Sequence, residues 1–110
     1  KVFSVEIVDE LAVQARQNLA RLGLEGIELR IGDGSHGWAQ HAPFDRIMVA
    51  AAPELIPPSL INQLKPGGRM VVPAGMADAQ QLMLVEKDMN QRLKTREIIP
   101  VRFGALETVN

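Results

Sequence analysis

The segment from Pro43 to Pro53 constrains the fold more than any other part of the chain. Its residues Ile47 to Ala52 form an uninterrupted apolar run with no polar side chain on either face. A run of this length between prolines predicts a strand that is buried on both faces in the middle of a parallel sheet. Ligands of such sheets bind just beyond the carboxyl ends of the strands, so the alanines that end the run would leave room for one. The alternative is a buried strand with nothing bound.

The residues before this segment predict one strand, helix and strand unit. Val2 to Glu6 has the pattern of a strand, and Asp9 is placed to cap a helix whose apolar residues follow at helical spacing. Gly23 is the expected end of that helix. Ile27 to Ile31 then alternates apolar and charged residues, which is typical of a strand with one face toward solvent.

The residues after it predict a short helix, another strand and a hairpin. Pro58 lies in the first turn of the helix, where proline is tolerated, and Arg69 to Pro73 form the next strand. Gln81 to Lys87 and Arg96 to Phe103 are two strands joined by a polar turn, which indicates an antiparallel hairpin. Pro100 in the second of them implies an edge, a bulge or a break. The fold class is therefore α/β.

Composition and charge narrow the classes of function. A chain of 110 residues, 46% hydrophobic and 23% charged, is ordinary for one globular domain. A net charge of −1 provides no basic field for nucleic acid or an anionic membrane surface. The chain has no cysteine, which excludes disulfides and fits a cytoplasmic protein. No apolar run approaches the length of about 18 residues that a membrane span needs, and His36 and His41 are too isolated to predict a metal site.

Two acidic residues follow successive predicted strands. In nucleoside-binding α/β folds, an acid at the position of Glu6 accepts hydrogen bonds from both hydroxyls of a ribose. Asp33, between Gly32 and Gly34, can adopt a tight turn that directs its carboxylate and nearby backbone N–H groups at the edge of a base. Because both acids end parallel strands, we expect them on the same rim of the sheet. The alternatives are a surface carboxylate and a plain turn.

The first residues of the chain suggest a piece of a longer protein. Lys1 already leads into a strand, and no initiator methionine precedes it. The glycine-rich loop that should lie about 20 residues before an acid such as Glu6 is not in this chain.

The motifs, taken together, resemble a class I S-adenosylmethionine-dependent methyltransferase and, more narrowly, the protein-L-isoaspartate O-methyltransferase family. Each motif is weak alone, but their order and spacing match from end to end of the chain. The motifs are Gly32-Asp33-Gly34 with Gly37-Trp38, Ala42-Pro43-Phe44-Asp45, Ala51-Ala52-Pro53, Ile56-Pro57, Leu64-Lys65-Pro66-Gly67-Gly68-Arg69 and Val72-Pro73-Ala74-Gly75.

The resemblance implies transfer of a methyl group from S-adenosylmethionine to the free α-carboxylate of L-isoaspartyl residues in damaged proteins. Carried over to this chain, Glu6 would hold the ribose hydroxyls, and Asp33 with the Gly34 backbone would hold the adenine. The loop that ends in Ala52 and Pro53 would lie near the transferred methyl group and the substrate. The resemblance implies no catalytic side chain, because a carboxylate nucleophile needs no general base.

The resemblance also implies a Rossmann-like sheet, mostly parallel with a carboxyl-terminal antiparallel hairpin, that lacks its amino-terminal strand. That strand would lie between Val2–Glu6 and Phe44–Ala52, so residues 1–110 would be the carboxyl-terminal portion of a single domain. The expected partners are isoaspartyl-containing proteins and the missing amino-terminal half, or a swapped copy of it. At Phe103 to Leu106 the chain departs from the family's usual Val-Pro-Leu. A methyltransferase with another substrate and a nucleotide-binding Rossmann-like domain are the alternatives.

Overall fold

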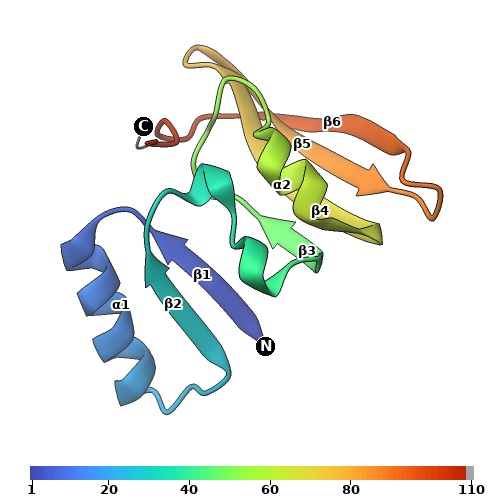
Figure 1. Ribbon diagram of the computed structural model, residues 1–110. Helices are drawn as coiled ribbons and strands as arrows, with labels where there is room; N and C mark the ends of the chain where they lie inside the picture. The colour runs from blue at the N-terminus through green and yellow to red at the C-terminus, as the bar shows by residue number, and fades with distance from the viewer. Residues whose placement is uncertain (109–110) are drawn as a thin grey trace.

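The computed structural model describes residues 1–108. Their strands form two separate sheets (Figure 1). Two strands, β1 and β2, form the first sheet, and four strands in the order β3-β4-β5-β6 form the second. The elements are β1 (Val2–Glu6), α1 (Asp9–Arg21), β2 (Ile27–Ile31), the 3-10 turns η1 (Gly34–His36) and η2 (Ala39–His41), β3 (Phe44–Met48), α2 (Pro58–Gln63), β4 (Leu64–Met76), β5 (Ala79–Lys87) and β6 (Leu93–Val101).

The β1-α1-β2 unit agrees with the sequence prediction in its elements. β1 pairs in parallel with β2, so that Glu6 lies opposite Ile31. α1 ends where expected, because Gly23 adopts the left-handed conformation (φ 67°) and the Leu24 N–H donates to the Leu19 carbonyl at 3.1 Å.

The predicted capping residue of α1 is wrong by one position. Val8 is the N-cap and makes no side-chain cap, while Asp9 is the first helical residue. Asp9 and Glu10 in the first turn still complement the helix dipole. The Glu6 carboxylate accepts the backbone N–H groups of Ile7 and Val8, just before the helix.

The second sheet contains the apolar core. β3 pairs in parallel with β4, whereas β4-β5 and β5-β6 are antiparallel. The predicted hairpin is confirmed, and Pro100 lies on β6, the outer strand of this sheet. α2 covers one face, as Figure 1 shows. The core cluster of buried side chains is Leu60, Leu64, Met70, Val72 and Val85.

The prediction that Ile47 to Ala52 form a strand buried on both sides is wrong for this chain. β3 ends at Met48, and the Met48 side chain is 82% exposed. The reason is that β3 pairs on one side only, with β4, while its other side borders a cavity. The expected break in the sheet between β1 and β3 is present, since no ladder joins these strands in residues 1–108.

β4 is longer than the predicted strand Arg69 to Pro73. It begins at Leu64, directly after α2, and Phe44 pairs with Leu64 before a register shift. Gly68 permits this approach of backbones, because a Cβ there would lie 2.9 Å from the Asp45 carbonyl oxygen.

Neither of the α-helices in residues 1–108 has the length and apolar character that a membrane span requires.

Candidate functional site

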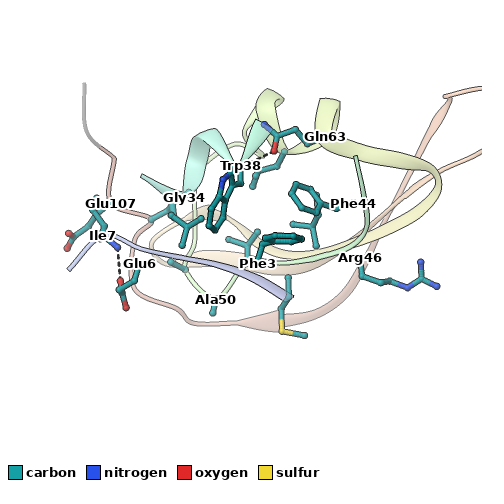
Figure 2. A pocket seen from close by; sticks show the side chains of 18 of the residues that line it. Phe3, Glu6, Ile7, Gly34, Trp38, Phe44, Arg46, Ala50, Gln63 and Glu107 are labelled. Atoms are coloured by element: carbon teal, nitrogen blue, oxygen red, sulfur yellow. Dashed lines mark hydrogen bonds between the residues drawn. The ribbon is translucent and has the colours of Figure 1, made fainter. Parts of the chain in front are cut away.

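A cavity of about 450 Å³ lies between the two sheets. β1 supplies one wall, β3 and the alanines after it supply the opposite wall, and residues 105–107 close one end. Figure 2 shows Glu6 and Glu107 toward one end of the cavity, Phe3 and Trp38 in the middle and Arg46 toward the other end. The carboxyl ends of β1 and β3 therefore open into one space.

Glu6 ends β1 and lines this cavity. One of its carboxylate oxygens, Oε2, accepts the Ile7 N–H at 2.8 Å and the Val8 N–H at 3.4 Å, which fixes the turn into α1 (Figure 2). In residues 1–108 the other oxygen, Oε1, accepts no hydrogen bond. The carboxylate is thus held by one oxygen, while the other remains available as an acceptor.

Asp33 and Gly34 follow β2 on the same rim as Glu6, as predicted. The Gly32 N–H donates to the Glu6 carbonyl at 2.9 Å, which joins the two strand ends. Asp33 is buried, and its Oδ1 accepts the Ser35 N–H at 2.8 Å and the Ser35 hydroxyl at 2.6 Å. The Asp33 carboxylate therefore shapes its own turn, whereas Gly34 lines the cavity directly.

The predicted substrate loop divides into two parts. Ala50 and Ala51 line the cavity, but Ala52 and Pro53 do not. The Ala52 N–H donates to the Gly104 carbonyl at 2.7 Å, and the Ala52 carbonyl accepts the Leu106 N–H at 3.0 Å. The closing segment of the chain is thereby fixed beside the alanine loop, which is how Ala105, Leu106 and Glu107 come to line the cavity.

An aromatic cluster lies beneath the rim. Phe3 makes an edge contact with Trp38 at 5.5 Å between ring centroids and stacks on His41 at 4.2 Å. Arg30 lies over the Trp38 ring at 4.7 Å. Trp38 therefore packs within this cluster, and it also lines the cavity.

Gln63 is a cavity residue that sequence reasoning missed. It is the last residue of α2, and its side-chain amide bonds to the backbone of the loop at residues 36–38. A glutamine at the end of a short helix carries no signal of such a contact, because the loop lies 25 residues earlier in the chain.

Two sheets that each contain a parallel strand pair, a terminal antiparallel hairpin, and strand ends that bring Glu6 and Gly34 to one cavity together define a class I methyltransferase-like α/β fold. The comparison with known proteins narrows this class. The chain belongs to the protein-L-isoaspartate(D-aspartate) O-methyltransferase family, whose sequence model matches residues 1–109. The family prediction is confirmed.

Individual relatives agree with this assignment. Protein-L-isoaspartate O-methyltransferase 1 of Polaromonas sp. (strain JS666) is 59% identical over 106 residues, which are 96% of this chain and 45% of that protein. Protein-L-isoaspartate O-methyltransferase 2 of Syntrophobacter fumaroxidans is 55% identical over 96% of this chain and 43% of its own length. The chain spans about half the length of the curated relatives it matches.

Solved structures confirm the predicted fold. A protein-L-isoaspartate O-methyltransferase superimposes with a TM-score of 0.85 at 31% identity, over 94% of this chain and 33% of that one. A second structure, of a putative protein-L-isoaspartate O-methyltransferase from Plasmodium falciparum in complex with S-adenosyl-L-homocysteine, superimposes with a TM-score of 0.84 over 98% of this chain and 53% of that one. At 20% identity the second likeness shows the fold alone.

Proposed function

We propose that the chain is the carboxyl-terminal portion of an enzyme that transfers a methyl group from S-adenosylmethionine to the α-carboxylate of L-isoaspartyl residues in damaged proteins. The observation that carries the proposal is the cavity, which brings Glu6, Gly34 and Ala51 to one space at the ends of the strands. The names of the family and of its relatives supply the substrate.

The residues on the rim fit a nucleoside cofactor. Glu6 presents a carboxylate oxygen that has no partner in the described chain, as a ribose hydroxyl requires. At Gly34 an added Cβ would meet no atom within 4 Å, so a flat base can approach this backbone closely. Asp33 stabilises the turn through its hydrogen bonds with Ser35. In the proposed complex it completes the adenine site with Gly34.

The substrate side follows from the alanine loop. Ala51 lines the cavity and leaves space for the reacting groups, while the backbones of Ala52 and Pro53 are fixed by hydrogen bonds. The Pro53 carbonyl accepts the Gly75 N–H at 3.1 Å, so the loop is fixed to β4 as well as to residues 104–106. This loop is the proposed contact with the transferred methyl group and the substrate.

The proposed reaction requires no general base among the side chains. S-adenosylmethionine, when bound, supplies an electrophilic methyl group. An α-carboxyl group has a reference pKa of about 3.5 and is ionised at neutral pH, so the cavity needs no general base. The work of the chain is to hold both reactants in line, and such orientation is worth roughly 7–11 kcal/mol.

The second partner we propose is an amino-terminal half, or a swapped copy of it, that completes a single domain with residues 1–110. β1 and β3 each have one side without a strand partner in the described chain, and the cavity lies between them. An extended segment can pair with both edges and continue the sheet. We also propose a cytoplasmic location, which the absence of cysteine supports.

The proposal is tested in a fused enzyme, made by joining the amino-terminal half of the Polaromonas relative to residues 1–110. We expect it to methylate a peptide with one isoaspartyl residue and to ignore the same peptide with normal aspartate, because only the former presents its α-carboxylate at the right reach. Transfer is measured with radiolabelled S-adenosylmethionine. Equal rates on both peptides, or transfer only to an unrelated acceptor, would contradict the proposed substrate.

A further inference from the structure

The side chain of Gln63 connects α2 to the loop at residues 36–38. Its Oε1 accepts the backbone N–H of Trp38 at 2.9 Å, and its Nε2 donates to the backbone carbonyl of His36 at 2.9 Å. One amide thus satisfies a donor and an acceptor on either side of Gly37, in the manner of a neighbouring strand. In Figure 2, Gln63 comes from α2 and lies close to Trp38.

Gly37 is shaped to receive this amide. Its φ is 62° and a Cβ on it would collide with the Gln63 side-chain oxygen, so any other residue would be strained by its backbone and would also displace the amide. Glycine at 37 and glutamine at 63 therefore fit one another.

The opposite end of the contact is rigid. α2 carries Leu60 into the apolar core, and Leu64 follows it there. Lys87 of β5 is only 7% exposed and donates its Nζ to the Ile61 carbonyl at 2.6 Å. The amide of Gln63 thus projects from a helix that is fixed to the second sheet, and it reaches a loop that continues from the first.

We infer that Gln63 is a positioning residue, which holds the loop at residues 36–38 so that Gly34 and Trp38 keep their places on the cavity wall. This inference rests on the proposed function, because that wall is the proposed nucleoside site. Gln63 acts on the backbone of the loop and does not touch the reacting atoms. Its loss should therefore weaken cofactor binding and raise the KM for S-adenosylmethionine, while kcat changes little.

The test uses Gln63→Met in the fused enzyme, which keeps the length and packing of the side chain but removes both hydrogen bonds. The control is Asn62→Ala, an exposed neighbour on the same helix. We expect Gln63→Met to weaken S-adenosyl-L-homocysteine binding in calorimetry by roughly tenfold, because ligand binding must then order the released loop. The KM for S-adenosylmethionine should rise by a similar factor, and the control should leave both unchanged.

Trp38 supplies a readout that is independent of activity, because it is the only tryptophan of residues 1–110. In the 110-residue chain without added ligand, Gln63→Met should shift its emission to the red and increase its quenching by acrylamide, since the loop is released. Gln63→Glu keeps the acceptor for the Trp38 N–H but faces the His36 carbonyl with a carboxylate. Its defect should match that of Gln63→Met at neutral pH and shrink toward about pH 4, where protonation restores a donor.

Unchanged Trp38 emission together with unchanged S-adenosyl-L-homocysteine affinity in Gln63→Met would overturn the inference, even if the variant melts at a lower temperature. A fall in kcat at constant KM would also overturn it. An unmodified fused enzyme that does not methylate the isoaspartyl peptide would instead contradict the proposed function, and the Trp38 measurement on the 110-residue chain would still decide the role of Gln63.

Discussion

The two sheets differ in how they are stabilised. The second sheet and α2 enclose the core cluster around Met70, Val72 and Val85, whereas among described residues 1–42 Ala12 is the one buried apolar side chain. Leu22, the residue that follows α1, is 65% exposed. Yet the proposed cofactor residues, Glu6 and Asp33, lie on this weakly packed first sheet. The site is therefore built on a part of the molecule that depends on contacts across the cavity for its position.

The largest expected effect separates the two sheets by stability. Met70→Ala removes a fully buried side chain from β4 and should lower the free energy of unfolding by about 2–5 kcal/mol. Leu22→Ala at the end of α1 should change it by less than about 0.5 kcal/mol, because that side chain is already in solvent. Chemical denaturation of the fused enzyme measures both. Equal losses would show that the first sheet has a core of its own.

Substitutions at two glycines, one in each part of the molecule, also test the difference between the two sheets. Gly68→Ala places a methyl group 2.8 Å from the Lys65 carbonyl oxygen, so we expect a loss of about 1–3 kcal/mol of stability. Gly34→Ala meets nothing within 4 Å and should leave stability nearly unchanged, but it fills the space in which the nucleoside would lie. Thermal melts and calorimetry with S-adenosyl-L-homocysteine distinguish the two effects. A Gly34→Ala variant that binds normally would remove this glycine from the site.

A further prediction concerns the ribose. Glu6→Ala should weaken S-adenosylmethionine binding by about 1–3 kcal/mol, the cost of leaving buried hydroxyls without partners. Glu6→Gln is the matched variant, because its amide oxygen can still accept the Ile7 N–H that fixes the turn into α1. Calorimetry on the two fused variants should therefore show a smaller loss for glutamine. Unchanged affinity in Glu6→Ala would exclude this carboxylate from the cofactor site.

Local signals in the sequence were enough for the first sheet. The strand, helix and strand unit, its end at Gly23 and the shared rim of Glu6 and Asp33 all follow from short-range patterns. The N-cap was misplaced because the Val8 carbonyl already accepts the Ala12 N–H at 3.0 Å, so the helix begins one residue earlier than a cap at Asp9 would place it. Apolar pattern also predicted the hairpin, since its strands pair across a short turn.

Long-range contacts could not be predicted in this way. The apolar run from Ile47 to Ala52 predicts a buried strand in the middle of a sheet. That position requires a strand on each side of β3, and here one side borders the cavity. Gln63 and Glu107 reach the site only through the packing of α2 and through the pairing of Ala52 with Ala105. Neither contact leaves a periodic or local mark on the sequence.

The measurement that tests the account most directly is a methyl-transfer assay on the purified 110-residue chain, with and without the amino-terminal half of the Polaromonas relative as a separate polypeptide. Mass spectrometry confirms that the chain is intact. Because the cavity between β1 and β3 leaves both strand edges unpaired, we expect no transfer to an isoaspartyl peptide from the chain alone and a partial return of activity when the second polypeptide is added. Full activity from the intact chain alone would contradict the account, because it would show that residues 1–110 need no strand between their two sheets.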